Sequence, residues 1–300
     1  MSRKYRIIVV IQTLKDRLFA ENNITASALR LDLIHPEVSG NKWFKLKYHL
    51  AEALSQNKTG MVSFGGAYSN HLVAMAFVCH ANGFKATAII RGDDVQMSNP
   101  SIRQMRAYGM ELVFVRRDAY RDKDKLISAY LSGHPDYYYV PEGGQSTLGI
   151  RGASEIMQPE YSKYTHVICA VGTGTTIAGL INHSLPHQCV TGICSLKVSD
   201  KNENALLGFL DDNTSHNNYS IRFDYHFGGY AKKNDELIRF MNELYGNEHI
   251  PTDFVYTGKL FYAVYDLVRK DYFTHGSNLL IVHSGGLQGN RSLPGGLLDF

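Results

Sequence analysis

The segment Val171–Gly179 has the composition of an anion-binding site. It reads Val-Gly-Thr-Gly-Thr-Thr-Ile-Ala-Gly and joins an apolar run to a helical stretch. Backbone N–H groups at a helix N-terminus, with neighbouring hydroxyls, form a favourable site for phosphate. A tight strand–helix turn that needs glycine explains the same residues equally well. A dinucleotide fingerprint is disfavoured because Ile177 stands where it requires glycine, and a Walker A loop because no lysine follows.

Lys42 is a second candidate for chemistry. It lies in the run Ser-Gly-Asn-Lys-Trp-Phe-Lys, at the start of a predicted helix, where the helix dipole disfavours a cation. Desolvation by the neighbouring aromatic residues and the positive charge of Lys45 would lower its pKa. Such an amine is a nucleophile toward carbonyl groups. An ordinary surface lysine is the alternative.

Two further glycine-rich segments, Ser63–His71 and His283–Gly289, each follow an apolar run. Ligands of open α/β sheets lie at the carboxyl ends of the strands, so both segments are candidates for ligand contacts. Ser69 and Asn70 could also simply cap the helix that follows them. Ser284 could equally be an ordinary hydroxyl at the end of a strand.

Short apolar runs alternate with amphipathic stretches along the chain, which predicts an α/β fold with mostly parallel sheets covered by helices. The predicted strands are Gly60–Phe64, Ala86–Arg91, Glu111–Val115, Tyr137–Val140, His166–Val171, Val190–Ser195 and Leu279–His283. The predicted helices are Lys42–Ser55, Asn70–Asn82, Ile102–Tyr108, Lys123–Leu131, Thr176–Ser184, Asn234–Leu244 and Lys259–Lys270.

The composition is that of a globular protein of 300 residues, 44% hydrophobic and 20% charged, with a formal net charge of +3. This small basic excess gives no indication of nucleic acid or membrane-surface binding. The apolar run Ile7–Ile11 is too short to span a bilayer and lacks a cleavage site of small residues. We therefore expect a cytoplasmic protein that binds neither nucleic acid nor membrane.

The four cysteines form no CxxC pair and lie in apolar surroundings, which favours buried, reduced thiols. His183 and His187 have the i,i+4 spacing of metal ligands on a helix, but Pro186 lies between them and disfavours that helix. No metal site is predicted.

Five motifs occur in a fixed order: Ser-Gly-Asn-Lys-x-x-Lys-Leu, Gly-Gly-Ala-Tyr-Ser-Asn-His, Gly-Thr-Gly-Thr-Thr-x-Ala-Gly-Leu, Val-Tyr-Thr-Gly-Lys and His-Ser-Gly-Gly-Leu-Gln-Gly. Together they resemble the 1-aminocyclopropane-1-carboxylate (ACC) deaminase / D-cysteine desulfhydrase family of pyridoxal-phosphate enzymes, over roughly residues 25 to 290. The resemblance implies the two-domain fold type II architecture, similar to that of tryptophan synthase β. Residues 1–46 and 146–300 would form the larger domain, and the inserted segment 47–145 the smaller one. The cofactor would lie between them.

The resemblance also assigns cofactor contacts. Lys42 is expected to be the Schiff-base lysine, and Asn70 to flank the cofactor ring near its 3-hydroxyl. Thr257 would lie by the ring nitrogen, with Ser284 close to it. The cofactor phosphate would be bound by one turn, whose residues are Gly172, Thr173, Gly174, Thr175 and Thr176.

Two side chains are expected to contact the substrate, a small amino acid. Ser69 would act as a nucleophile or bind the carboxylate, and Tyr256 would donate or accept a proton. Without its motif Tyr256, one of 19 tyrosines, would be read as a core residue. Lys45 and Lys259 are expected to be structural or electrostatic rather than chemical. The freed Lys42 would remove the substrate's α-proton, after which the β-substituent leaves.

Two positions indicate which substrate is cleaved. Family members that act on ACC usually carry Glu and Leu where this chain has Thr257 and Ser284. A carboxylate keeps the ring nitrogen protonated, whereas a hydroxyl makes the cofactor a milder electron sink. This predicts β-elimination from D-cysteine to pyruvate, ammonia and sulfide.

Alternatives to D-cysteine cleavage stay open. Within the same cofactor class they are ACC deamination to 2-oxobutanoate and ammonia, or a serine or threonine dehydratase-like reaction. A protein that binds pyridoxal phosphate or an amino acid without catalysis is a more distant alternative. By analogy with the family we expect a homodimer.

Overall fold

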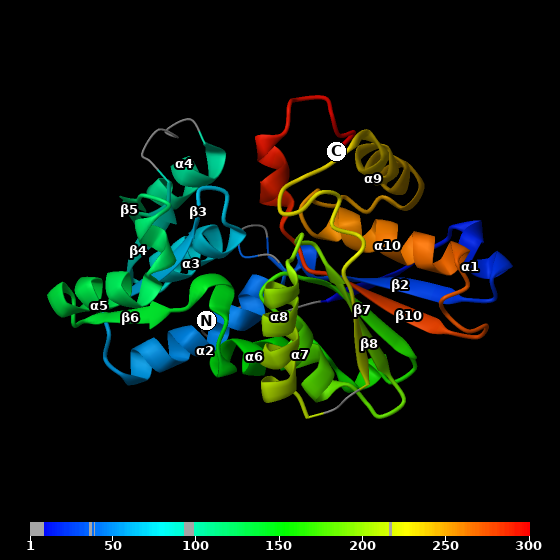
Figure 1. Ribbon diagram of the computed structural model, residues 1–300, viewed down its shortest axis with the longest axis horizontal. Coiled ribbons are helices and arrows are strands. Elements are labelled where there is room, and N and C mark those ends of the chain that lie inside the picture. Colours follow the sequence, from blue (N-terminus) through cyan, green and yellow to red (C-terminus); the bar gives the residue numbers. More distant parts are fainter. Residues whose placement is uncertain (1–8, 36–37, 39, 93–98, 216–217) are drawn as a thin grey trace.

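The computed structural model describes residues 9–35, 38, 40–92, 99–215 and 218–300. Its strands form two sheets, one of six strands and one of four, which lie side by side in Figure 1. The order in the large sheet is β1 (Val10–Thr13), β2 (Thr25–Arg30), β10 (Asn278–His283), β7 (His166–Val171), β8 (Cys189–Cys194) and β9 (Tyr219–Arg222). The order in the small sheet is β5 (Glu111–Val115), β4 (Lys85–Arg91), β3 (Gly60–Gly66) and β6 (Tyr137–Val140). All the pairings are parallel except that of β1 with β2.

Strand β10 has an uninterrupted apolar sequence because it is buried on both of its faces. Leu279, Leu280, Ile281 and Val282 are all fully buried. Successive side chains of a strand point to opposite faces, and here Leu279 and Ile281 join a different hydrophobic cluster from Leu280 and Val282. Helix α7 (Thr175–His183) contributes to the second of these clusters and α10 (Thr257–Arg269) to the first. The two helices therefore cover opposite faces of the large sheet.

The remaining helices flank the two sheets, as Figure 1 shows. Those nearest the small sheet are α2 (Asn41–Ser55), α3 (Asn70–Ala81), α4 (Pro100–Ala107) and α5 (Lys123–Gly133). The others are α1 (Arg17–Glu21), α6 (Thr147–Ser154), α8 (Asp200–Asn213) and α9 (Asp235–Glu248). The α/β fold class with mostly parallel sheets is thereby confirmed.

Glycine allows α2, α6 and α7 to pack closely. A Cβ on Gly152 of α6 would lie 2.1 Å from the carbonyl oxygen of Phe44 in α2. A Cβ on Gly179 of α7 would lie 2.6 Å from the Cβ of Ala153 in α6. Larger side chains at either position would separate the three helices, so these glycines fix the place of α2 relative to the large sheet.

The division into domains stays a prediction. The strands of the small sheet all lie between residues 60 and 140, and those of the large sheet lie before and after them. The predicted boundary at residues 46 and 47 falls inside α2, and one hydrophobic cluster includes Leu46, Leu72 and Leu180. Among the helices of the described residues, none combines the length and apolar character that a membrane span requires.

The cysteines are all free. Cys79, Cys169 and Cys194 are buried, as predicted, whereas Cys189 is only half-buried. Burial raises the pKa of the Cys79 and Cys169 thiols to about 12, so both are protonated and unreactive at neutral pH.

Candidate active site

A cavity of about 690 Å³ lies between the two sheets. Turns that follow β3, β7 and β10 line it, together with the first turn of α2. The predicted site residues on its wall are Lys42, Ser69, Asn70, Gly172, Thr173, Gly174, Thr176, Tyr256 and Ser284. Thr175 and Thr257 are fully buried and are not among the described residues that line it.

Lys42 is held at the start of α2 by its neighbours. Gly40 caps the helix with φ +70° and ψ −152°, and a Cβ there would lie 1.8 Å from the carbonyl oxygen of Ser284. The Nζ of Lys42 donates to Asn41 Oδ1 at 2.9 Å, and Asn41 Nδ2 donates to Thr176 Oγ1 at 2.8 Å. Asn41 therefore links the lysine to the turn after β7.

Burial lowers the pKa of Lys42 to about 8, although the carboxylate of Asp253 opposes the shift. Lys45, one helical turn further on, is also buried and lines the cavity. Its Nζ donates to Gly143 O at 3.3 Å, and burial together with Lys42 lowers its pKa well below the usual value. Neither amine forms an ion pair with a carboxylate of the described residues. The site is therefore suited to an anionic ligand.

The turn after β7 places backbone N–H groups at the wall of the cavity. Gly174 caps α7 in the left-handed conformation, with φ +82°. A Cβ on Gly172 would lie 3.2 Å from the ring of Tyr256, so glycine keeps this part of the cavity open. The hydroxyls of Thr173 and Thr175 are hydrogen-bonded to each other at 3.1 Å. The turn has the geometry of an anion site at a helix N-terminus.

The start of α3 presents polar atoms to the same cavity. Ser69 caps the helix by accepting from Leu72 N at 3.3 Å, and Asn70 Nδ2 donates to Gly286 O at 3.4 Å. Asn70 Oδ1 and His71 Nδ1 are buried with no hydrogen-bond partner among the described residues. Buried polar atoms without partners are rare, so a ligand in the cavity would be their natural partner.

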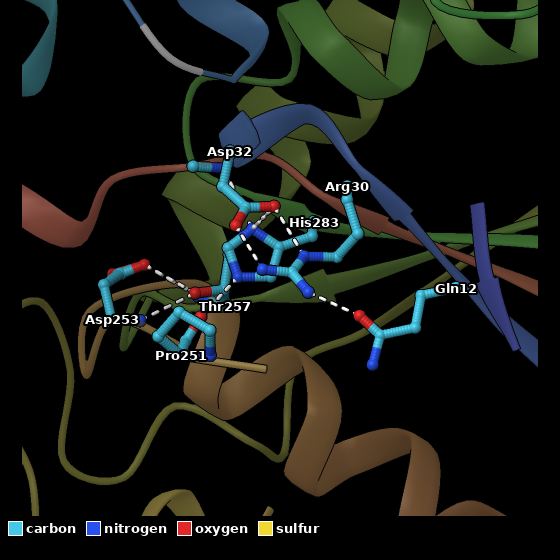
Figure 2. A network of polar contacts seen from close by, with 8 residues as sticks. Gln12, Arg30, Asp32, Pro251, Asp253, Thr257 and His283 are labelled. Carbon is cyan, nitrogen blue, oxygen red and sulfur yellow. Dashed lines mark hydrogen bonds and ion pairs between the residues drawn. The ribbon is translucent and has the colours of Figure 1, made fainter. Parts of the chain in front are cut away.

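Asp253 organises the start of α10. Its carboxylate accepts hydrogen bonds from the backbone N–H groups of Val255, Tyr256 and Thr257 at 3.0, 2.7 and 3.0 Å, and from Thr257 Oγ1 at 3.0 Å. Figure 2 shows the Thr257 side chain directed to Asp253. Tyr256 is thereby held at the cavity wall, and the proton of the Thr257 hydroxyl is engaged by Asp253. Of Thr257 and Ser284, only Ser284 lines the cavity.

A buried polar network supports the end of β10 (Figure 2). Arg30 and Asp32 form an ion pair at 2.7 Å, and Arg30 also donates to Gln12. His283 Nδ1 lies 3.2 Å from Asp32 Oδ1, and its Nε2 donates to Pro251 O at 2.7 Å. Because His283 directly precedes Ser284, this network fixes the backbone on which Gly40 packs.

The sequence reasoning missed several residues in and next to the cavity. Asn41 lies within the motif that contains Lys42, and this signal could have found it. Asp253 lies too far before the predicted helix Lys259–Lys270 to be recognised as its cap, because the helix in fact begins earlier, at Thr257. Tyr230 lines the cavity mouth, with its ring centroid 6.2 Å from that of Tyr256 in an edge-to-face contact. Its loop has no pattern that would have revealed this.

Comparisons with known proteins identify the family of the chain. Residues 15–285 match the family model of pyridoxal-phosphate-dependent enzymes. The chain is 30% identical to a provisionally named ACC deaminase of Thermotoga maritima, over 93% of this chain and 94% of that one. It is 26% identical to the mitochondrial bifunctional D-cysteine desulfhydrase/ACC deaminase of Arabidopsis thaliana, over 87% of this chain and 72% of that one. The solved structure of an ACC deaminase homologue has the same fold, with a TM-score of 0.80 at 24% identity, over 96% of this chain and 94% of that one.

Proposed function

The chain belongs to the pyridoxal-phosphate-dependent enzymes, in the group of ACC deaminases and D-cysteine desulfhydrases, and on that premise we propose that it cleaves D-cysteine or a close analogue by β-elimination. The observation that carries the proposal is the placing of Ser284 on the cavity wall, while the Thr257 hydroxyl is engaged by Asp253. The resemblance assigns these two positions to the cofactor's ring nitrogen. A hydroxyl there supports a mild electron sink, which suffices when the substrate has an α-hydrogen and a good leaving group.

The cavity fits the cofactor on its own chemistry. Asn70 Oδ1 is a buried acceptor without a described partner, as a ring hydroxyl would require. The amines of Lys42 and Lys45 line the cavity and lack ion-pair partners among the described carboxylates, so both are available to a bound ligand. We propose that Lys42 attaches the cofactor's aldehyde carbon, that Asn70 contacts its ring and that the Gly172–Thr176 turn binds its phosphate.

When bound, pyridoxal phosphate supplies an aldehyde that captures the substrate's amino group and a ring that withdraws electrons from Cα. Lys42 then accepts the proton from Cα, because burial lowers its pKa to about 8 and so makes a larger fraction of the amine neutral at physiological pH than in an exposed lysine. Burial raises the pKa of Tyr256 well above its usual value, so its phenol stays protonated and can donate to the departing sulfur. The overall reaction consumes one water and gives pyruvate, ammonia and hydrogen sulfide.

Ser69 is proposed to contact the substrate's carboxylate. It caps α3, so its hydroxyl lies beside the first backbone N–H groups of that helix. The positive end of the helix dipole favours a carboxylate at that point. His71 Nδ1, also on the cavity wall, has no partner among the described residues and would lie within the same helical turn.

The direct test is a substrate panel on the holoenzyme: D-cysteine, L-cysteine, β-chloro-D-alanine, D-serine and ACC, with detection of the keto acid formed. We expect the highest kcat/KM for D-cysteine or β-chloro-D-alanine. A higher kcat/KM for ACC would overturn the proposal and assign the chain to ACC deamination.

A variant at Ser284 sharpens this test. Ser284→Leu should reduce D-cysteine cleavage by at least tenfold, since leucine occupies space at the cavity wall and removes the hydroxyl, a change in a binding pocket that is typically worth about 1–3 kcal/mol. Ser132→Leu, at an exposed serine of α5, is the matched control. Thr257→Glu is a poor probe of substrate choice, because its carboxylate would be buried next to that of Asp253.

Two further properties are proposed from the family resemblance alone, a homodimeric assembly and a cytoplasmic location. Light scattering coupled to size-exclusion chromatography of the holoenzyme tests the first. A mass of one chain under these conditions would contradict it.

A further inference from the structure

Lys259 is a fully buried lysine in the first turn of α10. Its Nζ lies within hydrogen-bond distance of three backbone carbonyl oxygens: Ser195 O at 3.3 Å, His226 O at 2.9 Å and Gly229 O at 2.8 Å. An ammonium has three N–H donors, so each has an acceptor. Within the described part of the chain Lys259 forms no ion pair with a carboxylate. Burial lowers its pKa to about 8, and the Asp253 carboxylate opposes that shift.

The loop that provides two of these carbonyls has an unfavourable backbone. Between β9 and α9, Phe227 and Ala231 have φ values of +51° and +52°, and the intervening Gly228 and Gly229 have +90° and +120°. Left-handed conformations are uncommon for residues other than glycine and persist only where the surroundings impose them. The loop's own hydrogen bonds, from Gly229 N to His226 O and from Lys232 N to Gly229 O, are local. An anchor from outside the loop is required.

The same loop carries Tyr230 to the mouth of the cavity. Tyr230 is 49% exposed, yet it lines the cavity and its ring packs edge-to-face on that of Tyr256. The third carbonyl bound by Lys259, that of Ser195, directly follows β8, and the next residue, Leu196, also lines the cavity. Lys259 thus joins the Tyr230 loop to the segment at the end of β8.

We propose that Lys259 is a positioning residue, whose ammonium ties the loop of residues 226–231 to the end of β8 and thereby holds Tyr230 beside Tyr256 at the substrate entrance. Three convergent carbonyl oxygens require a donor with three N–H groups, which no neutral side chain of similar length provides. Without the ammonium, the oxygens would face one another in a buried space, and the loop would leave its strained conformation. The part played by Tyr230 toward substrate rests on the proposed function; the anchoring of the loop does not.

The anchoring is tested by amide hydrogen exchange, read by mass spectrometry on the full-length holoenzyme and on its Lys259→Met and Lys270→Met variants. Lys270 ends the same helix and is largely exposed, so it is the matched control. We expect exchange at residues 226–232 to be at least tenfold faster in Lys259→Met, with β8 and the middle of α10 within twofold of the unmodified protein. Unchanged exchange in the loop would overturn the proposal. So would an equal loss of protection throughout α10, because Lys259 would then stabilise the core rather than the loop.

A double-mutant cycle tests the consequence for the substrate. Lys259→Met and Tyr230→Ala should each lower kcat/KM for D-cysteine by at least tenfold, mainly through KM, and the double variant should be no worse than either alone. Multiplicative effects would mean that Lys259 does not act through Tyr230. If D-cysteine is not cleaved at all, the proposed function fails, and the exchange experiment still decides the anchoring.

Discussion

Gly40→Ala is a sharp test of how the fold places Lys42. Gly40 has φ +70° and ψ −152°, a region open essentially to glycine alone, where another residue costs about 1–3 kcal/mol. Its Cβ would also lie 1.8 Å from Ser284 O and 2.3 Å from the carbonyl carbon, so the backbone must move. Overpacking of this kind adds about 1–3 kcal/mol. The expected loss of unfolding free energy is therefore about 2–6 kcal/mol.

Gly83→Ala provides a matched control, because Gly83 has φ +71° and a Cβ there would meet nothing within 4 Å. The Gly83→Ala variant should lose about 1–2 kcal/mol of unfolding free energy, the usual cost of placing a residue other than glycine in the left-handed region. The effect of alanine on the unfolded chain is the same in both variants and cancels in the comparison.

The two variants are compared by urea unfolding of the cofactor-free protein and by titration with pyridoxal phosphate. Gly40→Ala should be the less stable and should bind the cofactor at least tenfold more weakly than Gly83→Ala, since Lys42 moves with the helix start. Equal stability and equal affinity would refute the packing of Gly40 on Ser284.

Three further predictions concern charge and the phosphate turn. The rate at which the cofactor-free protein captures pyridoxal phosphate should rise with pH and be half-maximal near pH 8. The reason is the lowered pKa of Lys42, above which its amine is mostly neutral. A capture rate that still rises steeply above pH 9.5 would contradict this. Asp253→Asn should lower the unfolding free energy by about 1–3 kcal/mol, measured by urea unfolding, since the NH2 group that replaces one carboxylate oxygen cannot accept the two hydrogen bonds which that oxygen receives. An unchanged unfolding midpoint would count against the role of Asp253 at the start of α10. Gly174→Val should weaken cofactor retention in equilibrium dialysis more than Thr175→Ala does. A Cβ at residue 174 would lie 2.9 Å from side-chain carbons of Leu206 and Phe209, so the whole turn would be displaced. Full cofactor occupancy of Gly174→Val at low cofactor concentration would place the phosphate elsewhere.

Much of the architecture could be predicted because buried parallel strands have continuous apolar sequences, as β7 and β10 do. Strands β1 and β9 were missed because they are short edge strands whose sequences, Val-Ile-Gln-Thr and Tyr-Ser-Ile-Arg, mix polar and apolar residues. Strand β2 was missed because its sequence Thr-Ala-Ser-Ala-Leu-Arg is only weakly apolar. Helix α6 was missed because its glycines argue against a helix, although close packing against α2 and α7 requires them.

Within the site, order along the chain identified which loops meet but not which side chains enter the cavity. Tyr256 and Thr257 are adjacent, yet successive residues at a helix start point about 100° apart, and Asp253 takes the Thr257 hydroxyl. The contribution of Tyr230 depends on hydrogen bonds from Lys259 to backbone carbonyls. Carbonyl groups are common to every residue, so such contacts leave no signature in the sequence.

Reduction of the holoenzyme with borohydride shows whether the cofactor is attached to Lys42. Reduction makes the attachment permanent, and peptide mapping by mass spectrometry then identifies the labelled lysine. We expect the pyridoxyl group on Lys42, which lines the cavity and whose pKa is lowered by burial. A label on Lys45 or Lys259, the two buried lysines of this region, would contradict the attachment to Lys42.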